Sequence, residues 1–235
     1  LVSDAFLFSG KLHLPIPAMI LAGPLYRYEL SFMTLLFLST VVLTGPAWCS
    51  QLCYFGAIDH WAARSATSGK PVLYSAPLRF TTLAVTISGA LVMRWLGASM
   101  WITTILALLF GSIGLAVMLV FSRTRRTMVH CTAYCPIGTL VHLLKKVNPF
   151  RLRISPQCTR CMRCLSHCRY DALHREDILK GTPGGTCTLC GDCLAGCPHN
   201  AIVYKFFGLS ARNARFLWLF LTISLHALFL AVARI

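Results

Sequence analysis

Residues 158–168 read CTRCMRCLSHC, and residues 187–197 read CTLCGDCLAGC. Both stretches have the spacing Cys-x2-Cys-x2-Cys-x3-Cys, in which soft thiolates let a tight loop wrap a cubane iron–sulfur cluster. The spacing therefore predicts two [4Fe–4S] clusters. A structural zinc site is the alternative, but zinc domains usually separate their cysteine pairs by a dozen or more residues.

The fourth cysteine of each run is expected to ligate the cluster of the other run, as in two-cluster ferredoxins. We assign to cluster I the ligands Cys158, Cys161, Cys164 and Cys197. We assign to cluster II the ligands Cys187, Cys190, Cys193 and Cys168. The second run is followed by the usual proline, Pro198, whereas Arg169 follows the first run, so the local turn there is less certain from sequence than the ligands are.

The composition excludes an ordinary soluble protein, because 56% of the 235 residues are hydrophobic, 12% are charged and the mean hydropathy is +0.66. The net charge is +15, and 14 of the 22 Lys and Arg residues fall within 122–213. A basic polar stretch between apolar segments follows the positive-inside bias, so we expect residues 122–213 on the cytoplasmic side of a bacterial-type inner membrane. Because no nucleic-acid-binding motif accompanies the charge, we expect no nucleic-acid partner.

Four apolar runs approach the length of a membrane span and predict helices over 29–46, 78–97, 100–121 and 215–233. The stretch 12–26 is apolar but short, and its prolines, Pro15, Pro17 and Pro24, predict an interfacial or re-entrant segment. The expected fold is mainly α, a polytopic transmembrane helix bundle carrying a cytoplasmic two-cluster ferredoxin-like (α+β) domain.

The expected domains follow from these spans. They are an interfacial segment (1–27), transmembrane helices (28–148), the ferredoxin-like domain (149–208) and a C-terminal transmembrane helix (209–235). The sequence begins at Leu1 without a signal peptide, so we expect further residues upstream.

A repeat lies within the helical part. Residues 49–60 and 131–142 share the frame Cys-x3-Cys-x2-Gly-x3-His, and each copy follows a predicted membrane helix. A spacing of four puts two thiols on one helical face, so the two copies together predict a third metal site or iron–sulfur cluster. Its ligands are Cys49, Cys53, Cys131 and Cys135, called here the repeat quartet. The alternatives are a redox-active dithiol pair and small apolar residues that pack in a core.

Three histidines are candidates for a quinone or proton site. His60 and His142 end the two repeat copies, two helical turns beyond the second cysteine, and His226 lies inside the last apolar run. An ionisable group within a membrane span is functional by default. The competing interpretation is a histidine that only satisfies a local hydrogen bond.

Basic residues surround the predicted clusters. They are expected to raise the cluster potentials and to offer a docking face to an acidic redox partner, or else only to enforce topology. These residues are Arg160, Arg163, Arg169, Arg175 and His167.

Taken together, these motifs resemble the NapH/NosR-type membrane polyferredoxins over nearly the whole chain. The second copy shows the Cys-x3-Cys-Pro pattern of that family, whereas Tyr54 replaces the proline in the first copy. The chain also continues into a helix after the clusters, as in NosR, whereas no counterpart of the flavin-bearing domain of NosR is expected within these 235 residues. The resemblance implies quinol oxidation or electron relay toward a reductase. The CcoG-type polyferredoxins, linked to oxidase assembly and copper reduction, share the same cysteine layout.

The leading prediction is a membrane-bound electron-transfer subunit that relays electrons between a quinone pool, or another membrane cofactor, and partner redox proteins such as a ferredoxin-like protein, a cytochrome c or a reductase. No nucleophile–base constellation or nucleotide-binding fingerprint is evident, so any catalysis is expected to be limited to redox steps of an oxidoreductase complex. The alternatives are a copper-reducing assembly factor and a structural anchor that docks a catalytic subunit.

Overall fold

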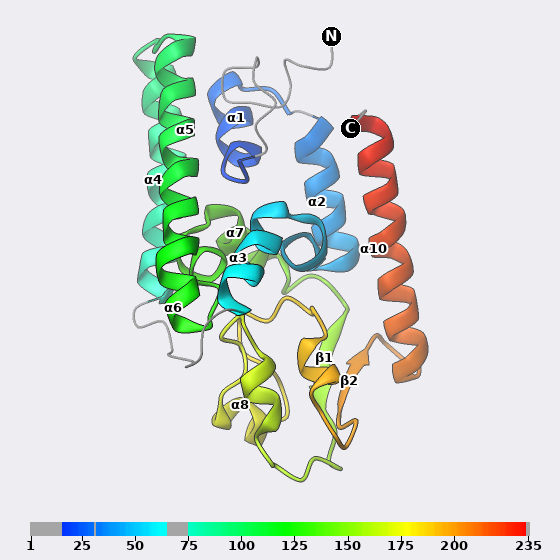
Figure 1. Ribbon diagram of the computed structural model, residues 1–235. Helices are drawn as coiled ribbons and strands as arrows, with labels where there is room; N and C mark the ends of the chain where they lie inside the picture. The colour runs from blue at the N-terminus through cyan, green and yellow to red at the C-terminus, as the bar shows by residue number, and fades with distance from the viewer. Residues whose placement is uncertain (1–15, 31, 65–74, 234–235) are drawn as a thin grey trace.

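The computed structural model describes residues 16–30, 32–64 and 75–233, which form a mainly helical molecule with a small sheet at one end (Figure 1). The helices are α1 (Met19–Arg27), α2 (Phe32–Thr44), α3 (Tyr54–Arg64), α4 (Ser75–Trp95), α5 (Met100–Val117), α6 (Arg123–Arg125), α7 (Pro136–Leu144), α8 (Arg175–Lys180), α9 (Asp192–Ala195) and α10 (Ala211–Ala233). Short π-helical turns are η2 (Trp48–Leu52), η3 (Met118–Ser122) and η4 (His130–Tyr134), and η5 (Arg163–His167) is a 3-10 helix. The mainly α prediction is confirmed.

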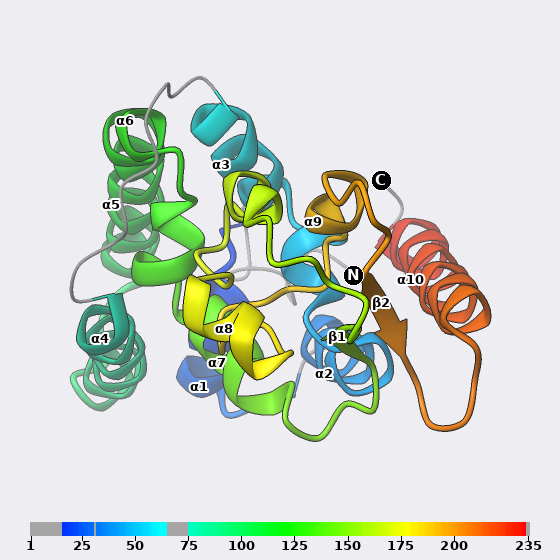
Figure 2. The same cartoon turned by 90° about the horizontal axis from the view of Figure 1, so that it is seen from below.

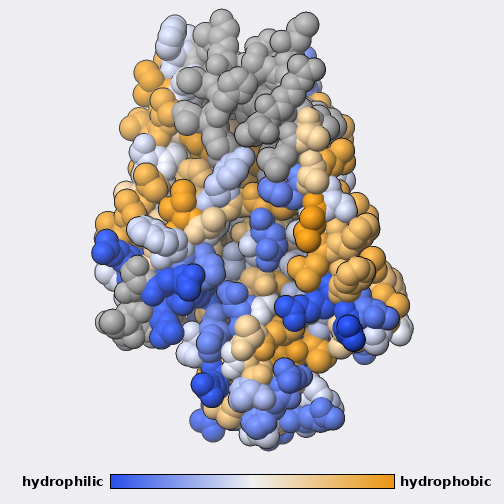
Figure 3. Space-filling model, turned by 45° about the vertical axis from the view of Figure 1, so that its right-hand side comes forward, coloured by the Kyte–Doolittle hydropathy of each residue, from blue (hydrophilic) through white to orange (hydrophobic). Residues whose placement is uncertain are grey.

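Helices α4 and α5 form a long hairpin along one side of the molecule (Figure 1). Within the described residues, the segments Ala76–Trp95 and Trp101–Arg125 are long and apolar enough to cross a membrane, with mean hydropathies of 1.4 and 2.5. Only 6% and 22% of their apolar windows are buried inside the molecule, so most of their side chains face outward. The apolar flanks above a polar base are visible in Figure 3. The predicted spans 78–97 and 100–121 are thus helices.

Helix α10 links the other side of the bundle to the small sheet. Trp218 is fully buried, and its indole N–H donates a 2.8 Å hydrogen bond to the carbonyl of Thr44 at the end of α2. The Trp218 ring also lies 5.4 Å from the ring of Tyr204 in the second strand. The predicted helices 29–46 and 215–233 are therefore present, over slightly different ranges, and they pack against each other.

Helix α1 lies largely in the proline-containing stretch 12–26, for which an interfacial or re-entrant segment is predicted. The helix passes through Pro24, which cannot donate to the carbonyl of Ile20 one turn earlier. The hydroxyl of Thr34, from the next helix, donates to that carbonyl instead, at 3.4 Å. Ile16 packs closely against Gly111 of α5. Residues 12–15 lie outside the described part.

The remaining unit forms the end of the molecule opposite the α4–α5 turn. Strands β1 (Arg151–Ile154) and β2 (Ile202–Lys205) pair antiparallel, with Leu152 opposite Tyr204. Both side chains are buried in a core that the cysteines of the two runs also join. Viewed from below, this unit lies over the middle of the bundle, between α4 and α5 on one side and α10 on the other (Figure 2). Its two-stranded sheet supplies the β part of the prediction.

Candidate metal centres

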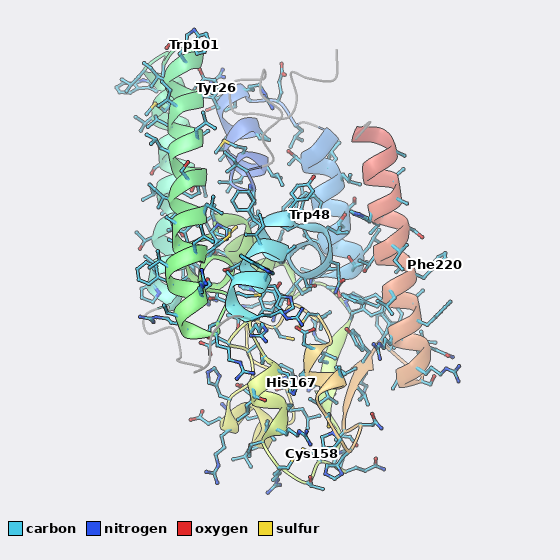
Figure 4. The ribbon with its side chains drawn as sticks, viewed as in Figure 1. Tyr26, Trp48, Trp101, Cys158, His167 and Phe220 are labelled. Atoms are coloured by element: carbon cyan, nitrogen blue, oxygen red, sulfur yellow. The ribbon has the colours of Figure 1, made fainter. Side chains whose placement is uncertain are left out.

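The four thiols predicted for cluster I surround one cavity. Cys158, Cys161, Cys164 and Cys197 line it together with apolar side chains such as Ile154 and Ile202. Cys161 is exposed and Cys164 is buried, so this cavity reaches the surface on one side. Cys158 marks its position near the lower tip of the molecule in Figure 4.

The four thiols predicted for cluster II surround a second cavity. Its lining includes Cys168, Cys187, Cys190 and Cys193, together with Tyr170. The structure thus gathers the fourth cysteine of each run with the first three of the other run. Cys164 of the first run and Cys193 of the second run are buried in the same core, so the two cavities are neighbours.

The backbone of the two runs bends at equivalent positions, 29 residues apart. Arg160 and Leu189 have φ angles of 56° and 59°, and Asp171 and Asn200 have φ angles of 51° and 49°. Left-handed conformations are uncommon for residues other than glycine, so their recurrence at matched positions indicates a shared loop shape. Two loops of one shape fit two cofactors of one kind.

Backbone N–H groups point at the fourth sulfur of each run. Ala172 donates to Sγ of Cys168 at 3.3 Å, and Ala201 donates to Sγ of Cys197 at 3.4 Å. Such bonds stabilise thiolates held by a metal and tune the potential of a cluster. Arg169, which stands where the second run has Pro198, therefore leaves the loop intact.

Arg169 instead joins the cysteine-rich unit to the helices. Its guanidinium donates to the carbonyl of Ala63 in α3 at 2.9 Å, and its own carbonyl accepts from the N–H of Met128 at 2.8 Å. The other predicted docking residues, Arg160, Arg163, His167 and Arg175, are exposed. Arg169 is thus half-buried and already engaged within the chain.

The two repeat copies fold alike. Cys49 lies in the π-helical turn η2 and Cys131 in the π-helical turn η4. Each turn ends in an extended residue, Cys53 or Cys135, whose N–H donates to the carbonyl five positions earlier. The expectation of two thiols on one regular helical face was therefore wrong, because the π-turn and the extended residue separate them. The duplication itself is present in the local structure.

The glycine of each copy has a steric role. A Cβ built on Gly138 would lie 2.6 Å from the carbonyl oxygen of Cys131, and one on Gly56 would collide with the carbonyl oxygen of Cys49. Neither approach is possible for a side chain, because these contacts are with backbone atoms. The repeated glycine thus lets each helix start close to its first cysteine.

The repeat quartet converges in the interior. Burial raises the pKa of Cys131, and the nearby thiolates of Cys135, Cys53 and Cys49 raise it further. Burial and the Cys53 thiolate raise the pKa of Cys135 to about 12. Four thiols in this environment become thiolates only when a cation shares their charge. The donor set therefore fits a thiophilic metal centre.

Tyr170 lies between the repeat quartet and the second cavity. It shares a buried core with Ala63, Met128 and Ala172, and Cys131, Cys168, Cys187 and Cys190 pack against this core. The three thiol sets therefore follow one another through the molecule, from the quartet near the end of α2 to the exposed Cys161. In Figure 4, Trp48, the neighbour of Cys49 in sequence, lies above Cys158.

Asp59 and His130 were not singled out by the sequence. Ligand atoms of Asp59, His130 and Cys131 lie within 4.8 Å of one another, and Asp59 Oδ1 is buried without a hydrogen bond. Burial raises the pKa of Asp59 to about 6 and lowers the pKa of His130 to about 3. The sequence offered one signal for Asp59. The chain has only 7 acidic residues, and Asp59 directly precedes the repeated histidine, His60.

The three predicted histidines lie apart and differ in their partners. His60 is half-exposed, and its Nε2 lies 3.8 Å from Oδ2 of Asp192. His142 is buried with neither ring nitrogen hydrogen-bonded, and burial lowers its pKa to about 3. His226 in α10 has a buried, unbonded Nδ1. His142 is thus the candidate with most unused hydrogen-bonding capacity.

Comparison with known proteins gives one family. Residues 27–71 and 104–155 match a family described as a 4Fe-4S binding domain. The two matched segments contain the two repeat copies, each with the preceding helical region, rather than the ferredoxin-type runs. No curated protein and no solved structure is significantly similar to the chain. The match supports an iron–sulfur family, and the 12 cysteines fit 4Fe–4S clusters with an electron-transfer role.

Proposed function

We propose that the chain is a membrane-bound electron-transfer subunit that relays electrons between a quinone pool and partner redox proteins. Two [4Fe–4S] clusters would be held by the ligand sets assigned above, and the repeat quartet would hold a third. Such clusters, when bound, accept and donate one electron at a time. The protein contributes the thiolates, the N–H donors to sulfur and the apolar surroundings that set the potentials.

The proposal depends on the succession of three thiol sets. Cys131 of the quartet packs against the same core as Cys168, Cys187 and Cys190 of the cluster II set. Cys193 of the cluster II set and Cys164 of the cluster I set are buried in another shared core. A row of one-electron sites is suited to moving electrons through the protein rather than to storing them at one site. The buried quartet is suited to the membrane end, and the exposed Cys161 end is suited to a soluble partner.

The membrane position is supported by α4 and α5, whose apolar surfaces face outward. We place a further span at α10 and a short apolar helix at α2. The positive-inside bias places the cysteine-rich unit on the cytoplasmic side, because its surroundings carry most of the basic residues.

A quinone would bind beside His142. This histidine and Nε of Arg79 are buried without hydrogen-bond partners, and α7 is fastened to α4 by the 3.2 Å bond from the Thr139 hydroxyl to the carbonyl of Arg79. A quinone carbonyl accepts hydrogen bonds of the kind that these nitrogens donate. Lys145 directly follows this helix and donates to the carbonyl of the proposed cluster II ligand Cys187, which brings this region close to that site.

A partner redox protein would dock at the opposite end, around the exposed Cys161. Arg160 and Arg163 flank this thiol and are themselves exposed. An acidic surface on the partner would steer association and bring its own cofactor close to cluster I.

A second candidate function is metal handling, as in an assembly factor that binds or reduces copper. The observation that favours it is the group Asp59, His130 and Cys131, whose oxygen, nitrogen and sulfur atoms suit a borderline divalent ion. Retained quinol-driven cluster reduction in an Asp59→Ala variant with lowered copper binding would favour this function.

The leading proposal is tested on anaerobically purified full-length protein in lipid vesicles. Reduced quinol is added, and cluster reduction is followed by low-temperature EPR. We expect cluster signals to appear with quinol as the only reductant. Clusters that dithionite reduces and quinol does not would overturn the quinone assignment.

A further inference from the structure

We infer that Tyr170 is the electronic bridge between the repeat quartet and cluster II, positioning the two centres and providing the path for the electron. The inference rests on the proposed function, because it requires a redox centre at the quartet. With clusters bound at both sites, one electron would leave reduced cluster II, oxidising it, and reduce the quartet centre, or the reverse, and no proton would be transferred.

Tyr170 is covalently close to one centre and hydrogen-bonded to the other. It lies two residues after Cys168, a ligand assigned to cluster II. Its hydroxyl donates a 3.1 Å hydrogen bond to the carbonyl of Cys49, a quartet residue 121 positions away. A short run of covalent bonds and one hydrogen bond therefore connects the two ligand sets.

The ring of Tyr170 is closely surrounded by other residues. Tyr170 is 5% exposed, and its core is shared by thiols of both centres, Cys131 on one side and Cys168, Cys187 and Cys190 on the other. Packing therefore holds the Tyr170 hydroxyl against the carbonyl of Cys49.

Other hydrogen bonds also connect the helical part to the cysteine-rich unit without involving an aromatic side chain. The Ser50 hydroxyl donates to the carbonyl of Thr188 at 3.1 Å, and Arg169 binds Ala63. Because these bonds dock the two parts, Tyr170 is not required merely to hold them together. Its particular contribution is a polarisable ring and a hydrogen bond directly between ligand segments.

Tyr204 provides a matched control. It is also buried beside cluster II, and its hydroxyl also donates to a backbone carbonyl, that of Leu189. Both Leu189 and Tyr204 belong to the cysteine-rich unit, so this bond does not lead to the quartet. Tyr204→Phe removes an equivalent hydroxyl from the far side of the same cluster.

The experiment compares the wild type, Tyr170→Phe and Tyr204→Phe as full-length holoproteins in detergent. Oxidised protein is mixed with dithionite, which reaches the exposed cluster I first, and samples are freeze-quenched for EPR. We expect Tyr170→Phe to slow the appearance of the quartet signal several-fold, while cluster I and cluster II are reduced at the wild-type rate. Tyr204→Phe should leave the quartet rate unchanged.

Iron and sulfide counts on the same samples separate a bridge from a support. Counts equal to those of the wild type, with a slowed quartet signal, support the inference. A wild-type rate in Tyr170→Phe, or a loss of iron that accounts for the missing signal, would overturn it. A wild type with no redox signal at the quartet would instead refute the third centre itself.

Discussion

The backbone N–H of Cys131 donates a 3.0 Å hydrogen bond to Oδ2 of Asp59. This bond joins the two repeat copies, because Asp59 belongs to the first and Cys131 to the second. The equivalent position in the second copy is Val141, whose apolar side chain cannot accept the corresponding hydrogen bond from the first copy. The duplicated unit is therefore asymmetric at its centre.

Asp59→Ala should destabilise the fold around the quartet. The Cys131 N–H would be left buried without a partner, which costs about 1–3 kcal/mol. We expect a lower midpoint of thermal unfolding and loss of metal from the quartet, measured by differential scanning calorimetry and iron analysis. Asp59→Asn, which keeps an acceptor oxygen, should retain most of both. Equal loss in the Ala and Asn variants would contradict this role of the hydrogen bond.

Gly138→Ala should prevent the quartet from forming. The added Cβ would lie 2.6 Å from the carbonyl oxygen of Cys131. Relieving this contact requires the backbone of one of the two segments to shift, which costs about 1–3 kcal/mol. Iron content is expected to fall toward that of a protein with two clusters. The control is Gly89→Ala in α4, where a Cβ meets nothing within 4 Å, and its iron content should be unchanged. A fully loaded Gly138→Ala protein would show that the close approach is dispensable.

Trp218→Phe should weaken the attachment of α10. It removes the N–H bonded to the Thr44 carbonyl at 2.8 Å and leaves that buried carbonyl unpaired, at a cost of about 1–3 kcal/mol. Faster limited proteolysis between β2 and α10 is the expected readout. Trp101→Phe is the matched control because this side chain is 72% exposed, and it should be cleaved at the wild-type rate. Similar cleavage of both variants would argue against the Trp218 contact.

His142→Gln should impair reduction by quinol and leave reduction by dithionite intact. The imidazole is buried and unbonded, so its replacement changes the proposed quinone site with little effect on the thiol sets. His174→Gln is the control, because His174 lies in the cysteine-rich unit and bonds Asp171 and Asp177. Quinol-driven reduction at the wild-type rate in His142→Gln would exclude this site.

The sequence was most informative where spacing alone determines geometry. The ferredoxin-type runs predicted the exchange of Cys168 and Cys197 between two ligand sets, and the structure gathers the thiols in that arrangement. The long apolar runs likewise predicted α4 and α5, because span length and composition are local properties. The quinone, the partners, the domain boundaries and the cytoplasmic side stay predictions.

The sequence was less informative where distant residues determine the outcome. In helix α1 the Thr34 hydroxyl donates to the Ile20 carbonyl that Pro24 leaves free, and no local sequence pattern predicts that bond. The π-turns at Cys49 and Cys131 are not distinguishable from α-helix by a spacing of four. Tyr170 meets Cys49 only through the docking of two segments 121 positions apart.

Counting iron and acid-labile sulfide in the anaerobically purified protein shows whether the chain holds three iron–sulfur centres in succession. We expect about twelve irons per chain in the wild type and about eight after Cys131→Ser, since each [4Fe–4S] cluster carries four. About eight irons in both proteins would contradict the third centre, and zinc without iron would contradict the whole account.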